Sequence, residues 1–179
     1  MDIVSLVQTK AFAGQDGLIL SLVWAASFLS FMYAPTSGMG SLLMWLTPVV
    51  VVWRMIAFRN YALDGVMSYG KALVYCLYVF FFASVVFALV QYVFLRFIDE
   101  GQMNNFLIES FNQSAPVLKQ QGNTQQDINA MTGMFVSLSP LNKAFIFMMT
   151  NFLTGLFLSF PLALIGRRTQ APTKRKEIR

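Results

Sequence analysis

The side chains best suited to acid–base chemistry in this 179-residue chain are carboxylates in its longest polar stretch. Asp99 and Glu100 are adjacent, so their side chains project in different directions and form a poor general acid–base pair. Glu109 and Asp127 each stand alone in an amphipathic segment, where a solvated face is the usual explanation for an acidic residue. Because catalysis needs convergent acid, base or nucleophile groups, these carboxylates do not predict an active site.

The sequence also lacks the residues that usually bind metals and cofactors. The chain has no histidine, and Cys76 is its only cysteine, so the common zinc constellations and an internal disulfide are excluded. No glycine-rich phosphate loop or nucleophile elbow occurs. Cys76 lies within an apolar run and is interpreted as a small apolar side chain. We therefore predict no catalytic, metal-binding or cofactor-binding residue, and a protein that is not an enzyme.

The most informative polar positions form a row in the last apolar stretch. Residues four apart lie along one face of a helix, with a slow drift around it. Small residues let helix backbones approach closely, and an amide can form a hydrogen bond across such a contact. Three interpretations stay open: packing within a helix bundle, a docking groove for a partner's helix, or a polar track for a solute. The row consists of Asn151, Gly155, Ser159 and Ala163.

This row lies in one of several long uncharged stretches, and the fold of those stretches decides what the row faces. Hydrophobic residues make up 56% of the chain and charged residues 12%, with a mean hydropathy of +0.59. No charge occurs over 17–53, 72–95 or 144–166. A helix that crosses the hydrocarbon core, about 30 Å thick, needs roughly 20 apolar residues. Because the runs are continuous rather than alternating, they predict membrane helices and not barrel strands.

The first uncharged stretch is too long for one span. As a single helix it would measure about 55 Å, so it must turn back on itself, and Pro35 to Gly38 supply the residues for that turn. Pro48 is expected to kink the second span, and Arg54 to reach from its last turns toward the headgroups. A re-entrant or interfacial segment stays open as an alternative for the second span. We predict a four-transmembrane-helix bundle with spans at 17–34, 40–58, 72–95 and 141–166.

The polar connection over 97–140 is predicted to be helical and to lie outside the membrane. Apolar residues recur at helical spacing from Met103 until Pro116, which is expected to interrupt the helix. Thr124 and Asp127 fit a capping box at the start of a second helix, and Ser139 is expected to cap the last span. The apolar faces of these two helices could pack on each other, lie along the membrane surface or bind a partner.

Basic residues set the expected orientation, because Lys and Arg are retained on the cytoplasmic side. They are sparse over 97–140 and dense near the ends, so we predict a multi-pass protein of the cytoplasmic (inner) membrane with both termini in the cytoplasm. Residues 1–16 are predicted to be a cytoplasmic or interfacial segment, retained because they make no convincing secretory signal.

The net charge of +5 comes mainly from the segment 167–179, predicted to be a basic, disordered tail. A nucleic-acid site is not favoured, because the cluster is short, follows an apolar run and lacks interleaved aromatic residues. Attraction to anionic lipid headgroups, about 1 kcal/mol per basic residue, explains the cluster better. The residues expected at the membrane surface are Arg167, Arg168, Lys174, Arg175 and Lys176.

The order of these features resembles a membrane-protein family of Bacteroidota known as domain of unknown function 4199. The resemblance runs from GLILSLV at Gly17, through FRNYALDGVMSYGKAL at Phe58, to FLTGLFLSFPLALIGRR at Phe152. It implies four spans and no established activity, so no catalytic residue follows from it. It also suggests an accessory role in lipid-linked sugar metabolism of the cell envelope. The connection over 97–140 departs from the family in carrying few charges.

Three functions are compatible with these observations. The first is a non-catalytic subunit or scaffold that docks another membrane protein, or a second copy, through the last span and the outer helices. The second is an oligomeric component of a transporter for a small solute or a lipid, since four helices rarely enclose a path alone. The third is an enzyme that acts on a lipid at the outer surface. The first is our leading hypothesis, and membrane lipids are the other expected partners.

Overall fold

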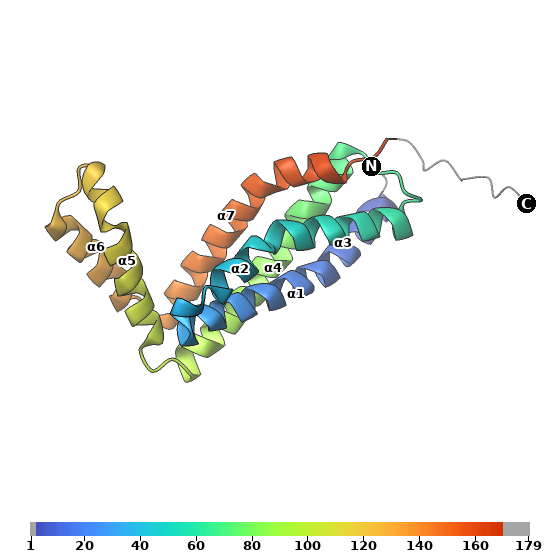
Figure 1. Ribbon diagram of the computed structural model, residues 1–179. Coiled ribbons are helices and arrows are strands. Elements are labelled where there is room, and N and C mark those ends of the chain that lie inside the picture. Colours follow the sequence, from blue (N-terminus) through green and yellow to red (C-terminus); the bar gives the residue numbers. More distant parts are fainter. Residues whose placement is uncertain (1–2, 170–179) are drawn as a thin grey trace, which may run out of the picture.

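The computed structural model describes residues 3–169, with side chains from residue 6 onward. Four of its helical stretches are long and apolar enough to cross a membrane (Figure 1). A helical segment joins the third span to the fourth, and the described residues form no strand beyond an isolated bridge. The predicted all-α, four-span bundle is therefore confirmed. The spans are α1 (Ile3–Tyr33), α2 (Met39–Trp45) with α3 (Thr47–Ala62), α4 (Tyr69–Phe97) and α7 (Pro140–Gly166).

The first span begins much earlier than the uncharged stretch does. Helix α1 starts at Ile3 and runs for 31 residues, so residues 3–16 continue the membrane helix instead of forming a segment of their own. Asp16, which the sequence places just before the span, is 1% exposed and lies inside the bundle. The bundle therefore contains a buried carboxylate, which the predicted spans do not include.

The second span is bent, as Pro48 predicts. After the short 3-10 helix η1 (Pro35–Ser37), Gly38 adopts a left-handed φ of 70°, a conformation that favours glycine, and α2 begins. The helix then breaks at Leu46, and α3 starts with Pro48 in its first turn, where the missing N–H is tolerated. Residues 39–62 together are long and apolar enough to cross the membrane as one bent span.

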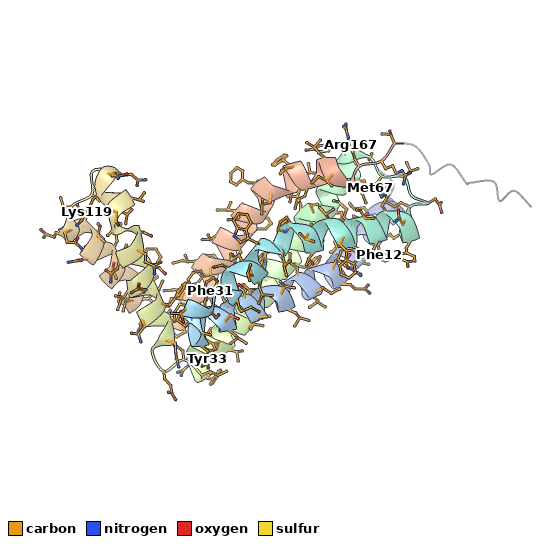
Figure 2. The ribbon with its side chains drawn as sticks, in the orientation of Figure 1. Phe12, Phe31, Tyr33, Met67, Lys119 and Arg167 are labelled. Carbon is orange, nitrogen blue, oxygen red and sulfur yellow. The ribbon has the colours of Figure 1, made fainter. Side chains whose placement is uncertain are left out.

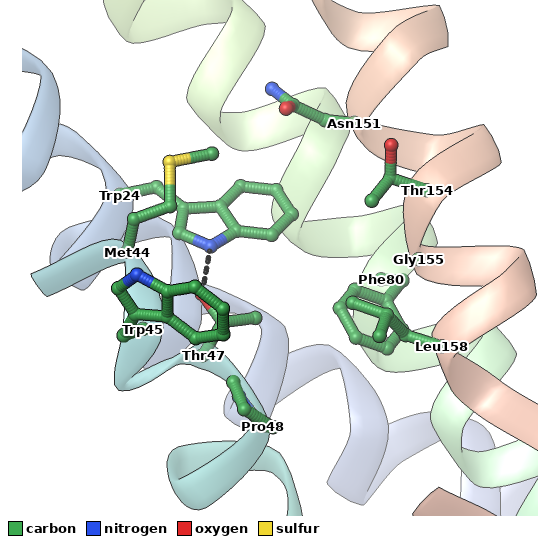
Figure 3. A pocket seen from close by; sticks show the side chains of 10 residues that line it. All are labelled: Trp24, Met44, Trp45, Thr47, Pro48, Phe80, Asn151, Thr154, Gly155 and Leu158. Atoms are coloured by element: carbon green, nitrogen blue, oxygen red, sulfur yellow. Dashed lines mark hydrogen bonds between the residues drawn. The ribbon is translucent and has the colours of Figure 1, made fainter. Parts of the chain in front are cut away.

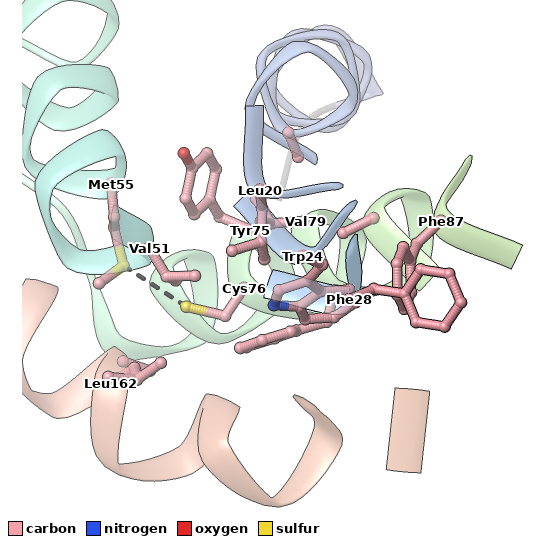
Figure 4. Close-up of a cluster of buried hydrophobic side chains, with 14 of the residues drawn as sticks. Leu20, Trp24, Phe28, Val51, Met55, Tyr75, Cys76, Val79, Phe87 and Leu162 are labelled. Carbon is pink, nitrogen blue, oxygen red and sulfur yellow. Dashed lines mark hydrogen bonds between the residues drawn. The ribbon is translucent and has the colours of Figure 1, made fainter. Parts of the chain in front are cut away.

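Helix α4 is the central element of the bundle and packs against both α1 and α7. Aromatic rings fill much of the core (Figure 4): the rings of Phe58 and Tyr75 stack with centroids 5.0 Å apart, and Trp24 meets Phe87 edge to face. The thiol of Cys76 is buried and lies 3.7 Å from Sδ of Met55. Cys76 is therefore a core side chain, as its apolar surroundings in the sequence predict.

The connection between the third and fourth spans is a helical hairpin, which we call the outer hairpin. It consists of α5 (Gln102–Gln120) and α6 (Gln125–Ser137), joined by a turn with Gly122 at a φ of 93°. The capping box of Thr124 and Asp127 is present. The expectation that Pro116 ends the first helix is wrong, because α5 passes through it. Pro116 removes one backbone hydrogen-bond donor from α5. Its ring lies on an exposed face, where it reaches solvent.

The outer hairpin diverges from the bundle and meets it only at its base (Figure 1). There Lys143, which is 7% exposed, donates from Nζ to Oδ1 of Asn104 at 2.7 Å and to the carbonyl of Val136 at 3.0 Å. The rings of Phe31 and Phe106 meet at the same junction, with centroids 5.8 Å apart. One charged side chain and one aromatic pair therefore fix where the hairpin leaves the membrane helices.

Candidate functional site

Three residues of the predicted row on α7 pack inside the chain. A Cβ added at Gly155 would lie 2.4 Å from Cγ of Phe80, so α4 and α7 approach too closely there for any side chain. Ser159 and Ala163 are fully buried, and Oγ of Ser159 donates to the carbonyl of Gly155 at 2.7 Å. All three residues are buried within the chain, which leaves no surface on them for a partner's helix.

Asn151, the fourth member of the row, has different surroundings. It is half-buried and lines a cavity between α2–α3 and α7 (Figure 3). Among the described residues its amide has no hydrogen-bond partner, whereas Nε1 of Trp24 across the cavity donates to Oγ1 of Thr47 at 3.0 Å. A continuous polar track along α7 is not present, because the row beyond Asn151 is closed by packing against α4.

Two adjoining cavities lie between the arms of the bundle and share Trp24, Met44 and Asn151. The first has a volume of about 240 Å³ and extends past Trp45 and Phe80. The second has a volume of about 150 Å³ and extends toward the outer hairpin. Both are lined mainly by aromatic and aliphatic side chains, and no Lys, Arg, Asp or Glu lines either one. We call them together the lateral groove.

A buried amide lies in the wall of the lateral groove. Gln91 of α4 is 2% exposed, and its Oε1 has no hydrogen-bond donor among the described residues. A buried polar atom without a partner costs free energy, and it does so all the more where surrounding lipid offers no water. Gln91 therefore differs from the half-buried Asn151, because its unpaired oxygen is also fully buried.

A second polar cluster, missed at the sequence level, lies at the other end of the bundle. Asp16 of α1 accepts from Nε of Arg54 on α3 at 2.6 Å and from the hydroxyl of Tyr75 on α4. The cluster therefore ties three spans together through one carboxylate. A signal for it exists in the sequence, because Asp16 and Arg54 flank the same uncharged stretch. Folding that stretch in half at Pro35 brings its two ends to the same level.

The expectation that Arg54 extends to the lipid headgroups is therefore wrong. Its side chain is 28% exposed and turns inward to the carboxylate of Asp16, which is 1% exposed. A buried carboxylate in an apolar medium needs a charged partner, and Arg54 is the cation on the neighbouring helix at that level. We interpret the cluster as structural, because it lies away from the lateral groove and holds three helices in register.

The outer carboxylates serve separate structural roles. Oδ1 of Asp99 accepts from the backbone N–H of Met103 at 3.1 Å and so caps the start of α5. Oε1 of Glu109 accepts from Nε2 of Gln113 at 3.0 Å. In the capping box of α6, hydrogen bonds from Thr124 hold the pKa of Asp127 below its ordinary value. Within residues 3–169 no group of three His, Cys, Asp or Glu side chains could hold a metal ion.

Basic residues at the end opposite the outer hairpin bind the carboxyl end of α7. Nη1 of Arg59 donates to the carbonyl of Gly166 at 3.0 Å, where a cation is favoured by the helix dipole. The backbones of Met67 and Arg168 exchange two hydrogen bonds of 2.8 Å, and Figure 2 places Met67 and Arg167 together at this end. Arg167 and Arg168 are exposed. The other residues of the predicted basic cluster, Lys174, Arg175 and Lys176, lie outside the described residues.

Comparison with known proteins identifies one family. The sequence model of a family described as "Protein of unknown function (DUF4199)" matches residues 15–168, which contain all four predicted spans. No curated protein and no solved structure matches the chain.

Proposed function

The chain belongs to the family described as "Protein of unknown function (DUF4199)", and from that premise we propose that it is a non-catalytic subunit or scaffold of a cell-envelope membrane complex. In this proposal the four spans anchor the chain, and the outer hairpin binds the extramembrane part of another membrane protein. A link to lipid-linked sugar metabolism belongs to the proposal as well, and it rests on the family resemblance alone.

The observation that carries the proposal is the way the outer hairpin is built. Its two helices pack on each other, with the rings of Phe111 and Phe135 5.6 Å apart and Ile128 1% exposed, while Ile108, Val117 and Met134 stay exposed. The hairpin therefore has a small core of its own, and its outward faces carry apolar side chains as well as polar ones. A self-contained arm fixed at its base suits a docking element.

The exposed surface of the outer hairpin is almost uncharged, and amides are its commonest polar side chains. Between residues 102 and 137 the charged side chains are Glu109, Lys119 and Asp127. Amide groups donate and accept hydrogen bonds without requiring an opposite charge, so a polar, neutral protein surface is the partner that they suit. The exposed amide side chains are Asn105, Asn112, Gln113, Gln120, Gln121, Gln125, Gln126 and Asn129.

We also propose that the outer hairpin lies on the non-cytoplasmic side and both termini in the cytoplasm. The distribution of Lys and Arg supports this orientation, because the basic residues of 54–71 share one end of the bundle with Arg167 and Arg168, and the following segment adds more basic residues to the sequence. The partner would then bind in the space outside the cytoplasmic membrane.

Site-specific photocrosslinking in native membranes tests this function. A photoreactive residue at Asn112, Gln120 or Gln126, all exposed on the outer hairpin, is expected to form a discrete adduct with the same membrane protein at each position. The matched control is Phe157 on the lipid-facing side of α7, which is 71% exposed and should give no protein adduct. Protein adducts absent from all three hairpin positions, in a chain that runs as a monomer from the same membranes, would overturn the proposal.

The transporter alternative is less well supported. It requires a polar path along α7, and the fully buried Ser159 closes that path against α4. The lateral groove favours a different role, in which the chain holds a lipid without moving a solute through the bundle.

A further inference from the structure

We propose that the chain binds one single-chain zwitterionic phospholipid, with its acyl chain in the lateral groove and its headgroup at the base of the outer hairpin. The inference does not require the partner proposed above, although Asn105 and Glu109 belong to both surfaces. It rests on three observations: an apolar groove, a buried acceptor at a defined depth, and an acidic cavity at the end of the groove.

The acyl chain would occupy the lateral groove. The groove lies between α2 and α7 (Figure 3), which belong to the two least buried spans, so lipid can reach it from the side. Trp24, Trp45, Phe80 and Leu158 give it an apolar lining. Its sections run one after the other along the bundle and share three residues, which suits a single flexible chain.

The position of Gln91 along α4 indicates which part of a bound lipid would lie beside it. It lies eight residues from Ala83, the middle of the 29-residue α4, so it stands about 12 Å from the centre of the membrane. The hydrocarbon core ends about 15 Å from that centre. A ligand group beside Gln91 is therefore the junction between headgroup and acyl chain. The buried Oε1 of Gln91 has no donor, and a rotation of its amide toward the groove would bring it to a hydroxyl group of the ligand.

The headgroup would lie in a third cavity, of about 360 Å³, between α1 and α5. It shares Phe31 and Phe106 with the groove, so the aromatic pair at the base of the hairpin is the common wall. Figure 2 places Phe31 at this end of the bundle. The polar lining consists of Gln102, Asn105 and Glu109.

The charge of this third cavity selects the headgroup. Glu109 is its only ionisable lining residue, and no Lys or Arg lines any of the three cavities. A carboxylate attracts an ammonium group, whereas a headgroup with only negative charge would meet repulsion. The amides of Gln102 and Asn105 can donate to a phosphate oxygen. Oε1 of Gln102 accepts from the backbone of Glu100, which directs its amide nitrogen to other partners.

Lysophosphatidylethanolamine combines these features and is the probe we select. It has one acyl chain, a free hydroxyl on the glycerol at the junction with that chain, and an ammonium headgroup. Two analogues separate the contributions: the deoxy form lacks the hydroxyl, and lysophosphatidylglycerol lacks the ammonium group.

Lipid titration of the full chain, followed by native mass spectrometry, tests the proposal. We expect one molecule of lysophosphatidylethanolamine per chain, bound about tenfold more tightly than the deoxy form, as one buried hydrogen bond implies. Gln91→Leu should weaken the lysolipid about tenfold and leave the deoxy form unchanged. That variant replaces an unpaired amide with an apolar group, so it is expected to fold.

The headgroup is tested with Glu109→Gln, which should remove the preference for lysophosphatidylethanolamine over lysophosphatidylglycerol. Glu100→Gln, a change at an exposed carboxylate outside the cavity, is the matched control and should keep that preference. Equal binding of all three lipids, or binding that neither Gln91→Leu nor Glu109→Gln changes, would overturn the proposal. A photoreactive residue at Met44 that attaches to a protein helix in native membranes would overturn it too.

Discussion

Replacing Asp16 with alanine is expected to destabilise the folded bundle by about 3–5 kcal/mol, the usual cost of removing one partner from a buried ion pair. The value should fall near the lower end, because Arg54 is 28% exposed and keeps partial access to polar surroundings. The hydroxyl of Tyr75 also loses its acceptor. Equilibrium unfolding of the purified chain in a graded mixture of mild and denaturing detergents measures the change.

Two comparisons make this prediction specific to the ion pair. Glu100→Gln removes an exposed carboxylate and should change the free energy of unfolding by less than about 0.5 kcal/mol. Asp16→Leu combined with Arg54→Met removes both charges and should recover a large part of the loss, since an apolar pair can replace a buried ion pair. If the double variant were no more stable than Asp16→Leu alone, the buried charge would not be the cause.

Replacing Gly155 with alanine is expected to destabilise the bundle by about 1–3 kcal/mol, as overpacking of a filled core does. The added methyl group would lie 2.4 Å from Cγ of Phe80, whose side chain is 1% exposed, so the ring or the helix must shift. The helices would have to separate at the contact that holds α7 to α4. The same detergent unfolding measures this loss.

Gly133 offers the matched control for this substitution. It lies within α6, and a Cβ there would meet nothing within 4 Å. Gly133→Ala should therefore stabilise its helix by up to about 1 kcal/mol through helix propensity alone. Phe80→Leu in the Gly155→Ala background should restore part of the lost stability. A Gly155→Ala chain as stable as the native one would contradict the close contact between α4 and α7.

The sequence predicts the architecture well, because the lengths of the uncharged stretches show which segments are stable in lipid rather than in water. Long uncharged stretches define four spans, Pro35 to Gly38 define the first turn, and Pro48 marks the bend of the second span. Capping residues define the starts of α6 and α7, at Thr124 and Ser139. These features are local in the chain, so propensity and hydropathy are enough to find them.

The polar sites are harder to predict, because they depend on which helix faces meet. The row on α7 left packing, docking and a polar track open, and the sequence does not say that Phe80 of α4 lies against Gly155. From the sequence, Asp16 is expected to lie just before the first span. Its burial becomes evident only in the structure, where Arg54 of α3 lies beside it. Gln91 reads as one more polar residue in a span, and only the three-dimensional arrangement leaves its oxygen unpaired in a groove.

Accessibility of single cysteines in intact cells tests the orientation of the chain, since the proposed function requires the outer hairpin to lie outside the cytoplasm. In a Cys76→Ala background, Asn112→Cys on α5 should react with a membrane-impermeant maleimide added to whole spheroplasts. Tyr61→Cys, at the opposite end of the bundle and 88% exposed, should react only after lysis. Labelling of Tyr61→Cys in sealed spheroplasts, with Asn112→Cys protected until lysis, would contradict this orientation and with it the proposed function.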